Sequence, residues 1–272
     1  MNRLIKTELH PIKVRRKNKK KSATKSFFRI FTVVSVALIL VYTLVNLYVI
    51  KPHIYYPGFE INIPIGYEIH GIDVSRYQSR INWEEVKEME VDGIKIGFAF
   101  IKATEGENNV DPQFKRNWRN VHKQNIPTGA YHFYIPGLNP DNQAKNFINV
   151  VSLKNGDLPP VLDIEISRNV PIIQMQKDVK RWLQLIENHY GIKPIIYTNI
   201  SFYETYFHSG FEEYPIWIAH YLQPLQPRTN RHWIFWQHSE KGRVNGIRGK
   251  VDFNVFYGDS SDFREILIGK EP

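Results

Sequence analysis

The chain contains a run of 21 residues, 30–50, without one charged side chain, and this run constrains the fold more than any other feature. At 1.5 Å per residue, a helix of this length spans about 30 Å, the thickness of a membrane's hydrocarbon core. The run is apolar on all sides, whereas a core helix usually has one apolar stripe. It exceeds the apolar core of about 7–15 residues in a cleaved signal peptide, and no Ala-x-Ala cleavage site follows. We therefore expect a retained signal-anchor helix that crosses the membrane once.

The charges of the chain are concentrated before this run. Residues 1–50 contain 11 Lys and Arg and one acid, Glu8, whereas residues 51–272 contain 25 basic and 26 acidic residues. Because cationic flanks tend to stay in the cytoplasm, residues 1–29 are expected to form a cytoplasmic tail, with the domain on the periplasmic or extracellular side. The near-neutral remainder gives no support for nucleic-acid binding. The absence of cysteine excludes a thiol nucleophile and cysteine-ligated metals.

Residues 51–68 have little periodicity and are expected to be a linker, and residues 69–272 to be a single domain, in which short apolar runs alternate with amphipathic stretches. The strand candidates are residues 69–74, 96–103, 128–134, 160–165, 194–198, 216–219, 232–237 and 251–256. The helix candidates are residues 83–89, 112–123, 141–151 and 172–190. This alternation predicts an α/β domain with a parallel sheet. It favours an irregular TIM-like (β/α) barrel, with some helices short or missing, over an open doubly wound sheet.

Carboxylates and aromatic residues follow several predicted strands, where a barrel of this kind has its active site. The most informative pattern is Asp163-Ile164-Glu165. Residues i and i+2 of a strand share a face, so the two carboxylates are expected to face one cavity. Two close carboxylates in a restricted pocket cannot both ionise easily, so one pKa should rise, as a proton donor requires. On its own, the pattern also fits a helix cap or an ion pair with a lysine.

Residues 70–257 resemble the glycoside hydrolase family 25 lysozymes, the Chalaropsis-type N-acetylmuramidases. The matching segments, in the family's order, are residues 70–75, 100–106, 129–134, 158–165, 236–237 and 251–256. The resemblance implies an irregular β/α barrel that cleaves the β-1,4 bond between N-acetylmuramic acid and N-acetylglucosamine in peptidoglycan. It implies that Glu165 is the proton donor, that Asp163 is its close partner, and that Asp73 and Asp252 flank the cleft.

Hydrolysis through an oxocarbenium-like state requires one protonated carboxyl group and at least one ionised carboxylate. Two roles for Asp163 remain open. It can stabilise the 2-acetamido group of the substrate as that group attacks the anomeric carbon, or it can act as a base on water. The Asp-x-Glu pattern also occurs in substrate-assisted chitinases, which favours the first role.

Aromatic side chains near the predicted mouth suit the apolar faces of sugar rings, although an aromatic residue on a buried strand often belongs to the core. The candidate substrate-binding residues are Tyr77, Tyr131, Tyr197, Trp217, Trp236 and the polar Gln237. The histidines His132, His220 and His238 are expected to be structural, because no serine or cysteine pattern makes a triad.

The sequence therefore predicts a membrane-anchored lysozyme-like hydrolase with peptidoglycan as its partner and a monomeric catalytic domain. We expect no cofactor and no metal, although four carboxylates with His132 are the ligand types of a Mg²⁺ or Ca²⁺ site. The alternatives are a non-catalytic module that binds the cell wall and a glycosidase that acts on a chitin-like polymer.

Overall fold

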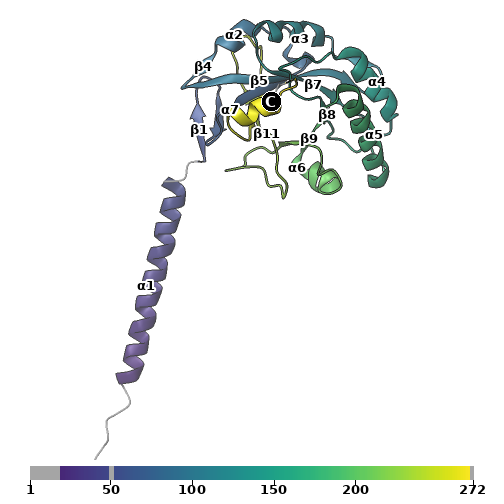
Figure 1. Cartoon of the computed structure of the whole chain (residues 1–272). Helices are drawn as coiled ribbons and strands as arrows, with labels where there is room; N and C mark the ends of the chain where they lie inside the picture. Colours follow the sequence, from purple (N-terminus) through teal and green to yellow (C-terminus); the bar gives the residue numbers. More distant parts are fainter. Residues whose placement is uncertain (1–18, 49–51, 270–272) are drawn as a thin grey trace, which may run out of the picture. The chain divides into compact units, whose positions relative to one another are not determined.

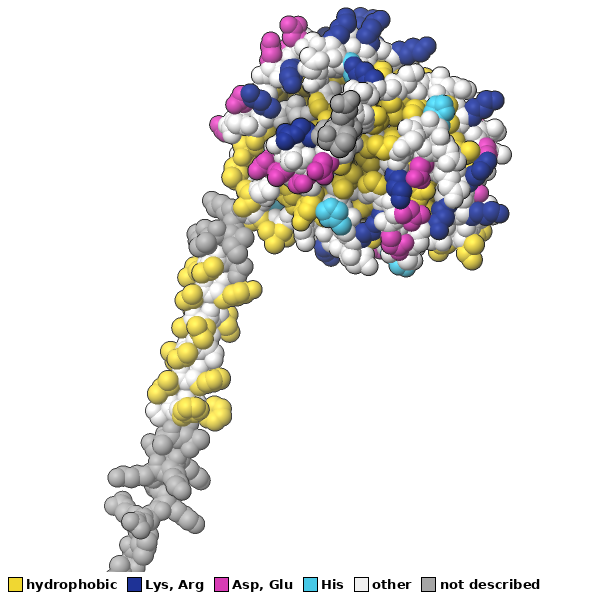
Figure 2. Space-filling view, in the orientation of Figure 1, with side chains coloured by type: hydrophobic (Ala, Val, Ile, Leu, Met, Phe, Trp, Pro, Cys, Tyr) yellow, Lys and Arg dark blue, Asp and Glu magenta, His cyan; other side chains and the backbone are white. Residues whose placement is uncertain are grey.

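The computed structural model describes residues 19–48 and 52–269, and the chain divides into two compact units, Met1–Lys51 and Pro52–Pro272. Helix α1 (Lys19–Tyr48) belongs to the first unit, and Figure 2 shows apolar side chains along it. Its segment Lys25–Val45, with a mean hydropathy of 2.3, is long and apolar enough to cross a membrane. Residues 1–18 of the expected tail and residues 49 and 50 of the expected span lie outside the described residues.

The second unit is a closed barrel of eight strands, as the sequence predicts (Figure 1). In order around the barrel, the strands are β3 (His70–Val74), β12 (Val251–Phe256), β11 (Phe235–Gly242), β10 (Ile216–Ala219), β9 (Ile195–Asn199), β8 (Val161–Asp163), β7 (Thr128–Phe133) and β5 (Ile94–Glu105), which pairs again with β3. The two-residue strands β4 (Glu90–Val91) and β6 (Asn109–Val110) add to β5.

Helices α2 (Trp83–Glu88), α3 (Phe114–Lys123), α4 (Pro140–Val150) and α5 (Ile172–Tyr190) follow one another around the outside of the barrel (Figure 1). The remaining helical elements are short, namely η1 (Arg76–Gln78), α6 (Ile200–Phe202), the π-helical turn η2 (Tyr203–Phe207) and α7 (Ser260–Glu265). The described residues 220–234 connect β10 to β11 without a helix. The expectation of short or missing later helices is confirmed.

The expectation of a parallel sheet is wrong for the last strand. Strand β12 is antiparallel to both of its neighbours, β11 and β3. The segment between β11 and β12, residues 243–250, is too short for the helical crossover that a parallel connection requires, so the chain turns back on itself. The first residues of β12, rather than its last, therefore lie at the barrel mouth.

The expected linker contains a β-hairpin, formed by β1 (His53–Tyr56) and β2 (Ile61–Pro64). Its apolar residues are buried: Phe59 packs edge-on against Phe253 with ring centroids 5.1 Å apart, and Ile61 and Ile63 join the core outside the barrel. The backbone carbonyl of Phe59 also accepts a hydrogen bond from the amide of Arg243 (2.9 Å). The hairpin is thus packed as part of the second unit.

The barrel interior is filled by a cluster of apolar side chains from alternate strand positions, including Phe98, Phe100, Trp217, Phe235 and Phe256. Two glycines make room for these rings. A Cβ atom at Gly71 would lie 2.5 Å from the ring of Phe98, and one at Gly129 would lie 2.4 Å from the ring of Phe100. The interior packing therefore depends on these two strand positions having no side chain.

We expect Gly129→Ala to lower the free energy of unfolding by about 1–3 kcal/mol, because the new methyl group overlaps the Phe100 ring. Thermal denaturation measures this effect as a loss of about 2–4 °C for each kcal/mol in a domain of this size. In the double variant Gly129→Ala/Phe100→Leu, the smaller side chain relieves the overlap, so the loss is smaller than the sum of the two single losses. Simple additivity would show that the overlap is not the cause.

Candidate active site

A pocket of about 290 Å³ opens at the mouth of the barrel, where the parallel strands end. It is lined by Asp73, Tyr131, Asp163, Glu165, Tyr197, Trp217, Tyr221, Gln237, Glu240 and Asp252. The lining thus brings together all four carboxylates that the sequence singles out. It also includes four of the six side chains expected to bind substrate.

The strand alternation explains how Asp163 and Glu165 come to share this pocket. Asp163 is the last residue of β8, with Val161 filling the barrel interior below it and Leu162 in the core outside the barrel. Glu165 lies two residues beyond, past the end of the strand, and lines the same pocket. The backbone of Ile164 remains in register, since its amide donates to the carbonyl of Tyr197 (3.0 Å). The chain therefore continues the strand's side-chain alternation as far as Glu165.

Asp73 is held by a network of buried amides. Its Oδ2 atom accepts hydrogen bonds from Nε2 of Gln237 and from Nδ2 of Asn254, both at 2.8 Å. The side-chain oxygens of these two amides accept hydrogen bonds as well. The Tyr197 hydroxyl donates to Oε1 of Gln237 (2.9 Å), and the Trp217 indole donates to Oδ1 of Asn254 (2.9 Å). These contacts fix the carboxylate of Asp73 in one orientation.

Asp252 faces Asp73 because the antiparallel register pairs these two residues. Burial raises the pKa of Asp73 to about 6, although hydrogen bonds from Asn254 and Gln237 oppose the shift. Burial, followed by the charges of Asp73 and Glu240, raises the pKa of Asp252 to about 9. At neutral pH, Asp73 is therefore ionised, and the protonated Asp252 donates a hydrogen bond to it.

Asp163 and Glu165 form the second carboxyl pair. Burial raises the pKa of Asp163 well above its usual range; the charge of Glu165 adds to the shift and the ammonium group of Lys102 opposes it. Burial also raises the pKa of Glu165, with a further contribution from Asp73, against hydrogen bonds with Asn199 and Asp163. The pair is thus built to retain a proton. One oxygen of Asp163, Oδ1, is buried and has no hydrogen-bond partner among the described residues, so it remains available to a ligand.

Aromatic rings form the lower part of the pocket. Trp217 stacks on Phe100 with ring centroids 4.5 Å apart, and Tyr197 packs edge-on against Trp217 at 4.5 Å. Tyr131 follows Gly129 on the inward-facing side of β7 and is half-buried. The pocket thus combines apolar surfaces with the acidic groups.

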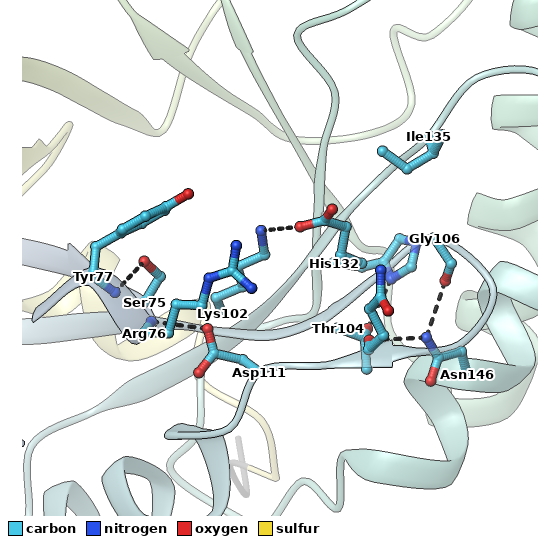
Figure 3. A network of polar contacts seen from close by, with 12 residues as sticks. Ser75, Arg76, Tyr77, Lys102, Thr104, Gly106, Asp111, His132, Ile135 and Asn146 are labelled. Carbon is cyan, nitrogen blue, oxygen red and sulfur yellow. Dashed lines mark hydrogen bonds and ion pairs between the residues drawn. The ribbon is translucent and has the colours of Figure 1, made fainter. Parts of the chain in front are cut away.

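Two of the expected substrate-binding residues lie elsewhere. Trp236 is fully buried outside the barrel, because its neighbour Gln237 faces the pocket and adjacent strand residues face opposite sides. Its indole donates to the carbonyl of His220 (2.8 Å). Tyr77 is 76% exposed after the end of β3 and does not line the pocket, and Arg76 lies 5.3 Å from the centroid of its ring (Figure 3).

Three residues of the site were missed in the sequence. Tyr221 lies two residues beyond the end of β10, and its hydroxyl donates to Oε1 of Gln237 (2.6 Å). Glu240 lies on β11, which extends to Gly242 and past the predicted end at residue 237. Asn254 is two residues from Asp252 on the same strand, so the alternation already places both on one face.

His132 is not part of the carboxylate pocket. Its Nδ1 atom lies 2.7 Å from the Thr104 hydroxyl (Figure 3). Its Nε2 atom lies 3.2 Å from Oε1 of Gln143, and its ring stacks on Trp182. Burial lowers its pKa to about 3, so the imidazole is neutral. His132 thus has a structural position and cannot join the four carboxylates in a metal site.

The sequence and the fold of this chain are similar to those of several known proteins. The family model for glycosyl hydrolases family 25 matches residues 72–247. The chain is 44% identical over 226 residues to the uncharacterized protein YegX of Escherichia coli O6:H1, covering 81% of this chain and 83% of YegX. It is 34% identical over 208 residues to lysozyme M1 of Streptomyces globisporus, covering 71% and 69%. The structure of a family 25 glycosyl hydrolase from Bacillus anthracis is similar, with a TM-score of 0.68, 36% identity and coverage of 73% of this chain and 93% of that one.

Proposed function

The chain belongs to glycosyl hydrolases family 25, and on this basis we propose that its barrel hydrolyses the β-1,4 bond between N-acetylmuramic acid and N-acetylglucosamine in peptidoglycan. The observation that carries the proposal is the pocket at the barrel mouth, where two pairs of carboxyl groups with raised pKa values face one space. The test is the release of reducing ends from purified peptidoglycan by the full chain in detergent, without any added cofactor.

Glu165 acts as the general acid in this proposal. Glycosidic cleavage requires a carboxyl group that is still protonated near neutral pH, and burial next to Asp73 raises the pKa of Glu165 in that direction. Its exposure is greater than that of Asp163, so it can reach the leaving-group oxygen of a sugar in the pocket. Glu165 donates its proton to that oxygen as the bond to the anomeric carbon breaks.

Asp163 stabilises the 2-acetamido group of the substrate. Its unpartnered Oδ1 atom can accept a hydrogen bond from the acetamido N–H. This contact favours the ionised form of Asp163 and leaves the retained proton of the pair on Glu165. The acetamido oxygen then attacks the anomeric carbon, and water later opens this intermediate with Glu165 as the base. Retention at the anomeric carbon, measured by NMR on fresh product, is expected, whereas inversion would assign Asp163 as a base on water.

Asp73 supplies the negative charge that stabilises the oxocarbenium-like transition state. It is ionised above its pKa of about 6, and Gln237 and Asn254 hold it in place. The protonated Asp252 shares its charge through a hydrogen bond. Tyr131, Tyr197 and Trp217 provide the surfaces against which the sugar ring packs.

These assignments predict the pH profile. Activity should decline below about pH 6, where Asp73 becomes protonated, and decline again at higher pH, where Glu165 loses its proton. The Asn254→Ala variant removes a hydrogen bond that lowers the pKa of Asp73, so the acidic limb of kcat/KM should move to higher pH. An unchanged acidic limb in a folded Asn254→Ala variant would exclude Asp73 as the group that controls it.

We further propose that α1 anchors the enzyme in a membrane, with its cationic N-terminal side in the cytoplasm and the barrel on the side of the cell wall. The apolar segment Lys25–Val45 and the charge asymmetry of the sequence support this orientation. A protease added to spheroplasts, from which the wall and any outer membrane have been removed, should degrade the barrel, and removal of residues 1–51 should release it from the membrane fraction.

A further inference from the structure

A second pocket, of about 400 Å³, lies next to the carboxylate pocket at the same end of the barrel. It is formed by the end of β5 and by the segments that follow β7 and β8, and Glu105, Glu107, Ile135, Leu138 and Arg168 are among its lining residues. Arg168 is three residues beyond Glu165, so about 10 Å at most separates their Cα atoms. This pocket is therefore within reach of groups attached to a sugar at Glu165.

The walls of this second pocket are fixed by two buried amide side chains of α4. Nδ2 of Asn146 donates to the carbonyls of Gly106 (3.0 Å) and Asn109 (3.2 Å). Gln143 accepts from the amide of Ile135 (2.9 Å) and donates to its carbonyl (3.1 Å). Figure 3 shows Gly106 with Asn146 and, on the neighbouring segment, Ile135. The pocket is thus preformed.

The charges in this pocket are only partly paired. Glu105 forms an ion pair with Lys102 (2.6 Å), whereas Glu107 accepts a hydrogen bond from the amide of Asn139 (2.8 Å) and has no cationic partner among the described residues. Arg168 is exposed and forms no ion pair within the part of the chain that the structure describes. One positive and one negative side chain therefore line the same pocket without neutralising each other.

The backbone that carries Arg168 is strained. Arg168 and Asn169 both have positive φ angles, 48° and 60°, in a turn closed by a hydrogen bond from the amide of Val170 to the carbonyl of Ser167 (3.0 Å). Asparagine tolerates the left-handed region, whereas a left-handed arginine is uncommon. The turn therefore holds Arg168 at the edge of the second pocket in a backbone conformation that arginine rarely adopts.

We propose that this pocket binds the peptide stem of peptidoglycan, with Arg168 pairing with a stem carboxylate and Glu107 with the ammonium group of a diamino acid. The inference rests on the proposed function, because the stem is attached to the N-acetylmuramic acid whose bond is cleaved. A stem contains alanine methyl groups as well as charges of both signs. Ile135 and Leu138 supply apolar contacts for the methyl groups. Arg168 and Glu107 are opposite in charge to the carboxylate and ammonium groups of the stem.

The test compares two substrates of the full chain in detergent micelles: glycan strands that carry their stems and the same strands after an amidase has removed the stems. We expect the wild-type KM for stem-bearing strands to be about 5- to 10-fold lower, as for one or two partly exposed charge pairs. Arg168→Gly, which suits the positive φ angle, and Glu107→Gln should each bring the ratio of the two KM values towards one. Arg168→Lys should retain part of the preference, because it retains the charge.

Arg119→Ala is the matched control, because Arg119 is an exposed cation on α3, away from both pockets, and its loss should leave the KM ratio unchanged. A wild-type enzyme that cleaves both substrates with equal KM, or an Arg168→Gly variant with the full wild-type preference, would overturn the inference and leave the hydrolase function intact. Failure to cleave either substrate would overturn the proposed function and the stem pocket with it.

Discussion

Replacement of Glu165 by Gln should lower turnover on peptidoglycan by about 10²–10⁴-fold, the range that general acid catalysis contributes. The amide has nearly the same shape but cannot donate a proton to the leaving oxygen. Because the carboxyl group of Glu165 is partly buried beside other acids, which raise the pKa and disfavour its charged form, the neutral amide should also be tolerated by the fold. KM should therefore change much less than kcat, and the circular dichroism spectrum should not change.

A matched control for this variant is Glu84→Gln, because Glu84 is an exposed acid on α2, outside the barrel. Its turnover should equal that of the wild type. If Glu165→Gln kept wild-type turnover, Glu165 would not be the proton donor, and the remaining carboxyl groups of the pocket would have to be tested in its place.

The second large effect concerns stability and comes from Asp252. Its pKa of about 9 in the folded chain is far above the value of 3.8 that it has when exposed. The folded state therefore binds a proton that the unfolded state releases, and stability falls as the pH rises from about 4 to 9. Asp252→Asn removes this loss, since an amide is neutral in both states. At about 1.4 kcal/mol for each pH unit above about 4, we expect a gain of up to about 5 kcal/mol at pH 8, seen as a rise in Tm of roughly 10–20 °C, and little change at pH 4.

The same substitution separates stability from activity. The amide introduced by Asp252→Asn can still donate a hydrogen bond to Asp73, so this variant should retain more activity than Asp252→Ala, which leaves Asp73 without this donor. Scanning calorimetry at pH 4 and pH 8 measures the first effect, and kcat/KM measures the second. A Tm that is lower than that of the wild type at both pH values would contradict a protonated Asp252 in the folded chain.

The sequence was informative about the barrel because its strands are short apolar runs separated by recognisable helices. The direction of the last strand could not be predicted in this way. Residues 251–256 look like any other buried strand, and only the brevity of the preceding loop indicates that β12 runs antiparallel. The hairpin β1–β2 was missed because each of its strands has four residues and residues 53–64 contain two prolines, Pro57 and Pro64, which gives too little periodicity to detect.

The site was predicted best where a local rule sufficed. The alternation in Asp163-Ile164-Glu165 placed both carboxylates in one pocket, and the same rule, applied to Trp236-Gln237, would have placed Trp236 in the outer core. Glu240 could not be found in this way. The pairing of β11 with β12 shifts register after Gln237 and again after Ser239, so the simple alternation no longer indicates where Glu240 points. Its place at the rim depends on tertiary structure.

The most direct test of the central claim is the identity of the sugar at the new reducing end. Purified peptidoglycan is digested with the full chain in detergent, the products are reduced with borohydride, and the fragments are analysed by mass spectrometry. We expect disaccharide peptides that end in reduced N-acetylmuramic acid from the wild type, and their loss in Glu165→Gln. Fragments that end in reduced N-acetylglucosamine, or in a non-reducing anhydro sugar, would contradict it.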